Sequence, residues 1–325
     1  MSISKTSEDV ARPAPPGHDS DADLLTAKVV PRRHPGQWVA AAAVLVVVAM
    51  AVHTLLTNPR FQWNVVAAYF TEASILRGLL LTVWLTAAVM VCGYALGILL
   101  AVMRLSGNPV LRSISFGYVW LIRSVPPLVQ LLFWYELASL YPQLSLGIPF
   151  GPSFVTVATA HLFTGLLAAF VGLTLDVGAF SAEIVRGGLL AVEKGQTEAA
   201  QSLGLSGARI FRRIVLPQAM PAIVPASGNL LIGMLKATAI VSVIAVQDLL
   251  YSAQLIYNQN FLIIPLLLVA TIWYIVLTTL LSVGQYFVER HYARGSARGG
   301  GGQGFWQLTR ANLPLFGRAG STGLS

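Results

Sequence analysis

Residues 193–217, which read EKGQTEAAQSLGLSGARIFRRIVLP, form the only long polar and charged stretch between the hydrophobic segments of this chain. A chain that interrupts apolar spans in this way is expected to present the polar segment at the membrane surface, where another molecule can bind it. The character of this stretch and of its partner therefore decides both the fold and the function.

The composition is that of a membrane protein. The residues are 55% hydrophobic and only 10% charged, whereas about a quarter of the residues in a typical soluble domain are charged. The formal net charge of +8 could indicate nucleic-acid binding. In so apolar a chain it fits better with lysines and arginines that orient loops across a bilayer. We expect a lipid bilayer as a partner, and no nucleic acid.

No residue pattern indicates catalysis. Cys92 stands alone in an apolar run, which argues against a disulfide framework or a thiolate metal cluster. The five histidines lack ligand spacing, and no GxxxxGK[ST] phosphate loop occurs. We therefore expect no catalytic, metal-binding or cofactor-binding residues.

Six apolar runs are long enough to cross about 30 Å of hydrocarbon, which predicts an all-α integral membrane protein with six transmembrane helices. The runs fall near residues 38–56, 76–103, 115–140, 154–182, 221–248 and 262–288. If the N-terminus is cytoplasmic, 17 of the 21 lysines and arginines lie on the cytoplasmic side. This bias places both termini and the polar stretch in the cytoplasm.

Domain boundaries follow from these runs. Residues 1–37 and the Gly-rich, basic residues 291–325 are expected to be disordered cytoplasmic tails. Residues 38–75 supply an extra first transmembrane helix, an uncleaved anchor rather than a signal peptide, and an external connection. Residues 76–290 form the core, which includes the loop 193–217.

The polar stretch is predicted to begin with a short helix over residues 198–203. Thr197 can cap this helix, and Glu198 would lie in its first turn, where the helix dipole favours negative charge. Gly204 follows at the position of a left-handed C-terminal cap.

A second helix is predicted after this cap. Ser206 can cap its start, and Pro217 is expected to end it. In the first helix, Ala199 and Ala200 leave a nearly bare surface that allows close approach by a partner. The pair of helices is therefore expected to bind a partner outside the membrane.

The sequence Glu198-Ala199-Ala200, followed by Gly204 and later by Leu216-Pro217, resembles the EAA loop of ATP-binding cassette importer permeases. Other motifs resemble the polar amino acid branch of that family, whose members carry histidine, glutamate, glutamine, arginine or opines. They occur in the family's order within residues 76–290, at Gly78–Thr82, Arg123–Gln130, Gly178–Gly187, Leu216–Ala219 and Leu235–Thr238. The chain departs from the branch at Ser124-Val125, at Ala239 and in its extra first span, so fine substrate specificity is not transferred.

The resemblance implies a type I importer permease core, and a transport subunit rather than an enzyme. Two permease chains, identical or paralogous, would form the pathway in a bacterial cytoplasmic (inner) membrane. Two cytoplasmic ATP-binding cassette subunits would hydrolyse ATP, and an extracytoplasmic solute-binding protein would deliver the solute. Closure of the ATPase dimer would drive alternating access. The residues that would couple to the ATPase are Gly195, Glu198, Ala199, Ala200, Ser202, Leu203 and Gly204.

Ionisable groups within the spans are further candidates, because burying charge in a membrane is costly. Lys236, two residues before Thr238, could form a structural ion pair or meet a substrate carboxylate. Asp176 could pair with Lys236 or line the pathway. Arg123 is either buried in a span or lies at the interface, where a surface helix would end before Pro126-Pro127; the second interpretation is favoured.

Glu183 and Arg186 lie at the cytoplasmic end of the fourth span with i,i+3 spacing. We expect them to orient that span as it enters the loop. Two other functions compete with the importer subunit. A secondary transporter would show internal repeats and has no use for the polar loop, and a membrane-embedded enzyme would need a catalytic set.

Overall fold

The computed structural model describes residues 35–148 and 153–293, and the chain divides into two units, Met1–Pro59 and Arg60–Ser325. In the first unit, helix α2 (Pro35–Thr57) has 23 residues and no charged side chain. It is long and apolar enough to cross a membrane. Of the predicted disordered tails 1–37 and 291–325, all but the inner edges lie outside the described residues. Those edges, 35–37 and 291–293, are helical.

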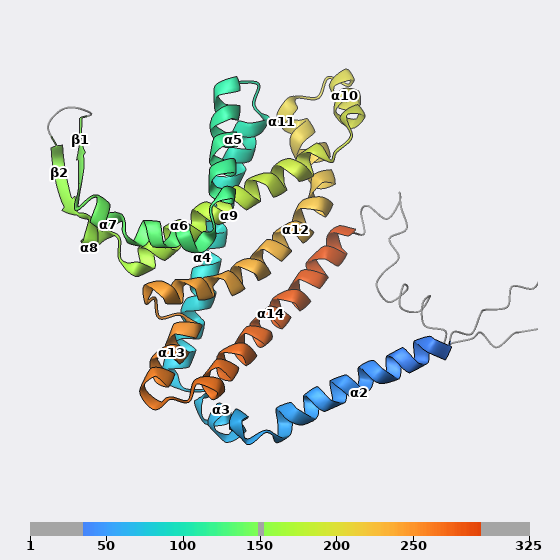
Figure 1. The fold of residues 1–325 in the computed structure, drawn as a ribbon. Coiled ribbons are helices and arrows are strands. Elements are labelled where there is room, and N and C mark those ends of the chain that lie inside the picture. The colour runs from blue at the N-terminus through green and yellow to red at the C-terminus, as the bar shows by residue number, and fades with distance from the viewer. Residues whose placement is uncertain (1–34, 149–152, 294–325) are drawn as a thin grey trace, which may run out of the picture. The chain divides into compact units, whose positions relative to one another are not determined.

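The second unit is a bundle of long helices joined by short ones (Figure 1). The long helices are α4 (Ala73–Leu105), α9 (Gly165–Leu190), α12 (Leu216–Ala237) and α14 (Ile263–Ala293). The shorter ones are α3 (Trp63–Tyr69), α5 (Pro109–Ser124), α6 (Pro127–Tyr135), α7 (Leu137–Leu140), α8 (Thr159–Leu162), α10 (Lys194–Ser202), α11 (Gly207–Ile210) and α13 (Leu249–Asn260). Three irregular helical segments complete it, namely η1 (Pro59–Phe61), which starts in the first unit, the π-helical η2 (Phe211–Val215) and the 3₁₀-helical η3 (Thr238–Ile244).

The fold class predicted from the sequence is confirmed. Among the described residues, five helices are long and apolar enough to span a membrane, and α5 with α6 forms a sixth candidate that bends by 99°. The bend falls at Val125, between Ser124 and the two prolines, because the proline rings disfavour helical backbone in the residues before them. The predicted break at Pro126-Pro127 is therefore present.

Helices α4 and α9 make the most extensive contact of the bundle, and they cross closely because glycines on α4 face α9. A Cβ added at Gly97 would overlap the Ser181 hydroxyl, and one added at Gly93 would overlap Val177. The Gly93–Gly97 spacing places both glycines on one helix face, an arrangement typical of tightly packed membrane helices.

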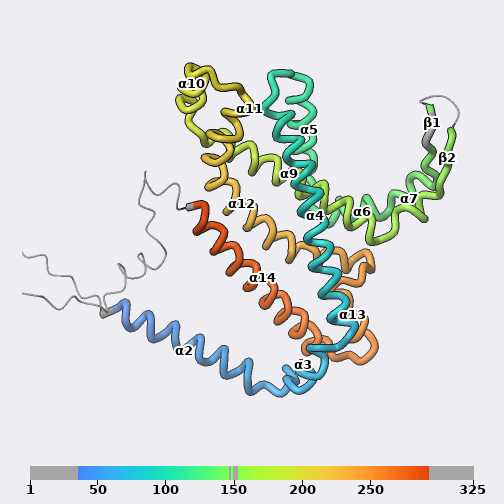
Figure 2. The backbone as a smooth tube through the Cα atoms, turned by 180° about the vertical axis from the view of Figure 1, so that it is seen from behind, coloured from blue at the N-terminus to red at the C-terminus, as the bar shows by residue number. Residues whose placement is uncertain are grey.

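Three apolar clusters fill the described part of the bundle, and the smallest joins Leu100, Val119 and Ala182. The central one joins α4, α6, α9, α12 and η3 through Leu85, Val89, Leu131, Leu173, Val177, Met234 and Val241. The second lies at the other end of α4, where α3, α13 and α14 meet, and contains Val66, Ile75, Leu249, Leu266 and Val269. In both views this end, marked by α3 and α13, lies opposite α10 (Figures 1 and 2).

One part of the predicted fourth span is wrong. Residues 153–158 form strand β2 (Ser153–Ala158), which pairs antiparallel with β1 (Gln143–Gly147). The segment Phe154–Val157 is rich in aromatic and β-branched residues, which favour a strand. Helix α9 begins only at Gly165, after Thr164, whose hydroxyl accepts a hydrogen bond from the Leu167 amide at 3.4 Å.

Candidate functional site

Helix α10, which contains the Glu198-Ala199-Ala200 motif, projects at one end of the bundle (Figures 1 and 2). Within the unit it contacts α11 and η2. Ala200 faces inward and is only 3% exposed, whereas Glu198 and Ala199 are exposed. The Ala200 methyl group therefore packs against the rest of the unit, whereas the Ala199 methyl group lies on the exposed surface of the helix.

The end of α10 is fixed by a pair of backbone hydrogen bonds. The Leu205 amide donates to the Ala200 carbonyl at 3.2 Å, and the Gly204 amide donates to the Gln201 carbonyl at 2.9 Å. These bonds require left-handed backbone at Gly204, which has φ 73°. The predicted left-handed cap at Gly204 is confirmed.

The predicted start of this helix is wrong. It begins at Lys194, with Glu193 in the capping position and without a side-chain capping bond. Thr197 therefore lies inside the helix and does not cap it, and Glu198 lies beyond the first turn. Gly195 did not stop the helix, because a glycine inside a helix costs only about 1 kcal/mol relative to alanine.

The predicted end of the second helix at Pro217 is also wrong. The chain stays helical from α11 through η2 into α12, with Pro217 in the first turn of α12. Proline lacks an amide hydrogen and is tolerated where a helix starts. The π-helical turn before Pro217 lets the helix continue, because the Leu216 amide donates a hydrogen bond to the Phe211 carbonyl, five residues earlier. Ser206 occupies the capping position of α11, but its side chain makes no capping bond.

The residues expected to couple to the ATPase form a mostly exposed surface. Leu203 is 80% exposed although it is apolar, and it lies directly beside the left-handed Gly204. Nothing in the described residues lies within 4 Å of a Cβ added at Gly195, so this position is open. All seven except Ala200 are exposed, namely Gly195, Glu198, Ala199, Ser202, Leu203 and Gly204.

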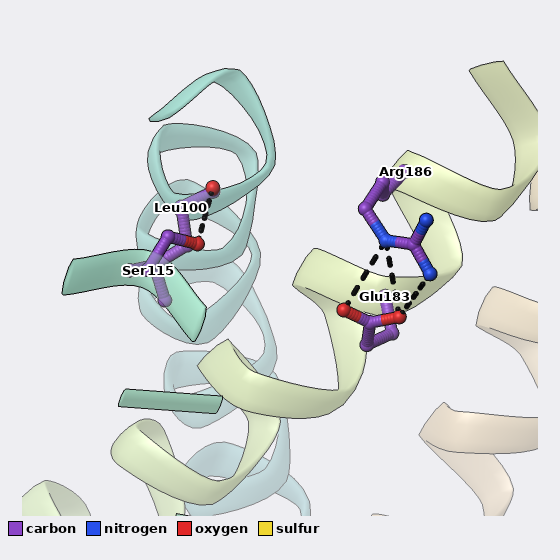
Figure 3. Close-up of polar contacts among 4 residues, drawn as sticks. All are labelled: Leu100, Ser115, Glu183 and Arg186. Atoms are coloured by element: carbon purple, nitrogen blue, oxygen red, sulfur yellow. Dashed lines mark hydrogen bonds and ion pairs between the residues drawn. The ribbon is translucent and has the colours of Figure 1, made fainter. Parts of the chain in front are cut away.

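Glu183 and Arg186 pair on α9, as their spacing predicts (Figure 3). Arg186 Nη2 donates to Glu183 Oε2 at 2.6 Å, and Arg186 Nε lies 3.1 Å from the same oxygen. Their side chains are 25% and 30% exposed. The pair lies within the last two turns of α9, directly before the polar loop.

Of the other charged candidates that the structure describes, Asp176 lies near Arg123 and not in an ion pair with Lys236. Asp176 is buried on α9, and the positive charge that acts on it is that of Arg123. Among the described residues Lys236 forms no ion pair with Asp176, and its side chain is exposed. Arg123 is exposed in the last turn of α5, with its guanidinium 5.0 Å from the Phe180 ring centroid.

Thr238 is fully buried rather than open to a cavity. It lies at the start of η3, and its hydroxyl donates to the Leu235 carbonyl at 2.6 Å. Tyr274 of α14 interacts with Thr238 and also with Thr82 of α4. Thr238 thus belongs to the packing between helices.

Asp248 joins the same buried group, and sequence reasoning did not single it out. Its Oδ1 accepts a hydrogen bond from the Tyr251 amide at 2.8 Å and so caps α13, while Tyr274 Oη lies 3.5 Å from its Oδ2. The Leu249 amide donates to Thr82 Oγ1 at 3.1 Å. An Asp followed by an apolar helical run is a recognisable capping signal.

Comparison with known proteins gives one consistent family. Residues 93–294 match the family described as binding-protein-dependent transport system inner membrane component. The chain is 42% identical over 270 residues to the arginine transport system permease protein ArgU of Corynebacterium glutamicum, covering 82% of this chain and 84% of the relative. It is 33% identical over 190 residues to the nopaline transport system permease protein of Agrobacterium fabrum, covering 58% and 76%.

Solved structures show the same likeness. The chain matches an amino acid ABC transporter crystallised with histidines at 33% identity and a TM-score of 0.56, covering 67% of this chain and 94% of that one. A methionine ABC transporter in an inward-facing conformation matches at 22% identity and a TM-score of 0.52, covering 68% and 97%, which supports the fold alone.

Proposed function

The chain belongs to the family of binding-protein-dependent transport system inner membrane components, and on this premise we propose that α10 couples it to a partner ATPase and that its cargo is a cationic or other polar amino acid. It is the membrane-spanning permease subunit of an ATP-driven amino acid importer, a transport component rather than an enzyme.

The exposed tip of α10 carries the coupling proposal. Leu203 is 80% exposed and lies next to a cap whose geometry depends on Gly204. Burying such a leucine in a partner would gain about 1.5–3 kcal/mol. Because α10 contacts α11 and η2, which continue as helix into α12, a force on α10 would be transmitted to a membrane-spanning helix.

The proposed orientation puts both termini and α10 in the cytoplasm. The bias of the basic residues supports it. The opposite end of the bundle, with α3 and α13, would then be extracytoplasmic, where we propose that a solute-binding protein delivers the solute. A second permease chain, identical or paralogous, would complete the pathway.

The proposed pathway residues are Asp176 and Arg123. One supplies a negative and the other a positive charge near the bend between α5 and α6, which matches the two charges of an amino acid. The most extensive similarity above, to an arginine permease, supports a cationic cargo. Lys236 and Thr238 are weaker candidates, since Thr238 is buried.

Reconstitution tests the proposed function. The chain and its cognate ATPase subunit would be placed in proteoliposomes with the cognate binding protein. ATP hydrolysis and uptake of labelled arginine, glutamine and histidine would be measured. Glu198→Arg should abolish stimulation of ATP hydrolysis, whereas Glu136→Arg, at the boundary of α6 and α7, should not. Uptake that survives Glu198→Arg unchanged would contradict coupling through α10.

A further inference from the structure

Two arginines meet where α4 ends and α5 begins. Arg104 lies in the last turn of α4, and Arg112 lies at the start of α5. Together with Ser113 and Phe116 they line a hollow of about 320 Å³. In both views this turn lies at the same end of the bundle as α10 (Figures 1 and 2).

The two helices are fastened beside this hollow. The Ser115 hydroxyl donates to the Leu100 carbonyl at 2.8 Å, and the serine is buried (Figure 3). Leu100 lies one helical turn before Arg104. The Arg104 guanidinium also lies over the Phe116 ring, 4.4 Å from its centroid, a favourable contact between a cation and an aromatic face. The Arg104 side chain therefore lies against α5.

Acceptors for these arginines are missing among residues 35–148 and 153–293. There, Arg104 Nη1 is buried and has no hydrogen-bond partner. In the part of the chain that the structure describes, neither Arg104 nor Arg112 forms an ion pair. A buried charged donor without an acceptor is costly. The missing acceptor is thus expected to come from another molecule.

The surrounding charge favours an anion. A second hollow, of about 350 Å³, shares Arg104 and Phe116 with the first and extends to Arg123 and Glu183. Within the described residues, Glu183 is the one acidic residue that lines the two hollows. It is hydrogen-bonded to Arg186, and the charges of Arg104 and Arg123 also act on it. The two hollows therefore carry an excess of positive charge.

The hollow is expected to lie at the level of the lipid headgroups in the membrane. Helix α4 has 33 residues, which gives a length of about 50 Å against about 30 Å of hydrocarbon. Its last turn therefore reaches the headgroup layer. One and two turns beyond Arg112, Phe116 and Trp120 expose 54% and 62% of their surface on the same face of α5, which suits contact with acyl chains.

We propose that the phosphate of an anionic phospholipid binds to Arg104 and Arg112 in this hollow, with Ser113 as an additional donor and with acyl chains against Phe116 and Trp120. Arginine forks bind phosphate through paired, charge-assisted hydrogen bonds. The apolar surface continuous with the hollow selects a lipid over a free phosphate. Such a lipid would brace the α4–α5 turn at the end of the bundle that carries α10.

The full-length chain in complex with its ATPase tests the proposal in nanodiscs of phosphatidylcholine containing phosphatidylglycerol. Native mass spectrometry would count the phosphatidylglycerol molecules that remain bound. The Arg104→Gln/Arg112→Gln variant should retain this lipid about tenfold less, since each lost charge-assisted bond weakens binding severalfold or more. The matched control is Arg290→Gln, in the last turn of α14 and outside both hollows, which should retain the lipid as the wild type does.

A second measurement tests the proposal even if the double variant does not fold. Phosphatidylglycerol with brominated acyl chains should quench the fluorescence of Trp120 in the otherwise unaltered chain, identified by its loss in Trp120→Phe. Brominated phosphatidylcholine should quench it severalfold less, and soluble glycerol phosphate should not reverse the quenching. The proposal would be overturned if both lipids quenched equally, or if the double variant retained the lipid undiminished. It would also be overturned if the double variant lost the ATPase subunit but kept the lipid.

Discussion

The Leu205 amide donates to the Ala200 carbonyl at 3.2 Å, across a turn in which Gly204 takes φ 73°. This bond ties the only fully inward-facing residue of α10 to the chain that leads into α11, and leaves Leu203 at the outer tip. The shape of the surface presented to a partner therefore depends on one glycine.

Gly204→Ala should reduce stimulation of the partner ATPase. Left-handed backbone costs a residue with a Cβ about 1–2 kcal/mol, although nothing in the unit would clash with that Cβ. We expect stimulation to fall about fivefold to thirtyfold in proteoliposomes. Gly204→Asn should retain more, because asparagine tolerates this conformation better. Gly207→Ala, also in open space but without positive φ, serves as the control; a loss there equal to that of Gly204→Ala would contradict the conformational reason.

Leu203→Ser should weaken the affinity for the ATPase subunit. If the leucine becomes buried on binding, its loss removes about 1.5–3 kcal/mol, which corresponds to about tenfold or more in the dissociation constant. Fluorescence titration of the ATPase against nanodisc-held chain measures this. Leu140→Ser changes a leucine that is 59% exposed in α7 and should leave the affinity unchanged.

Asp248→Ala should lower the melting temperature of the chain in nanodiscs. Asp248 is fully buried, and the change removes the cap of α13 and leaves the Tyr274 hydroxyl without its carboxylate partner. Loss of a cap costs about 1 kcal/mol, and an unsatisfied buried group costs a further 1–3 kcal/mol or so. Asp248→Asn keeps an acceptor oxygen and should lose less. Identical losses in the two variants would argue against the hydrogen-bonding role.

The Glu183–Arg186 pair should contribute little to stability. The side chains are about one quarter exposed, and isolated pairs on one helix are worth about 0.3–0.5 kcal/mol. Glu183→Gln should change the free energy of unfolding by less than about 1 kcal/mol. If the pair instead orients α9 before the loop, Glu183→Arg should impair uptake, and Glu183→Arg/Arg186→Glu should restore most of it. Failure of the exchanged pair to restore uptake would contradict an orienting role.

The large features of the fold could be predicted because they depend on length and apolar content. Spans such as α4 and α14 need only enough consecutive apolar residues to cross the hydrocarbon. The bend after Ser124 could be predicted because proline acts on its own local backbone. Gly204 could be predicted for the same reason.

The errors arose where the neighbouring context decided between two local solutions. Pro217 was read as an end of a helix, but the π-turn at Phe211–Val215 allows the helix to continue. The strand Ser153–Ala158 was read as part of a span, because an apolar run alone does not distinguish a strand from a helix. Thr197 offered a cap, yet the helix had already started at Lys194.

The candidate site was found in sequence where its residues are contiguous, and missed where they are distant. The exposed face of α10 comes from one short segment. In contrast, Asp248 and Tyr274 meet across two helices, and Arg123, rather than Lys236, acts on Asp176. Single-sequence spacing contains no information on such pairs.

Site-specific crosslinking tests the coupling role of α10 most directly. A photoreactive phenylalanine analogue would replace Leu203 in one sample and Leu140 in another, with each chain assembled with its ATPase in nanodiscs. A covalent product with the ATPase from position 203, and none from position 140, is predicted. If position 203 gave no such product while the ATPase remained bound, α10 would not be the coupling helix.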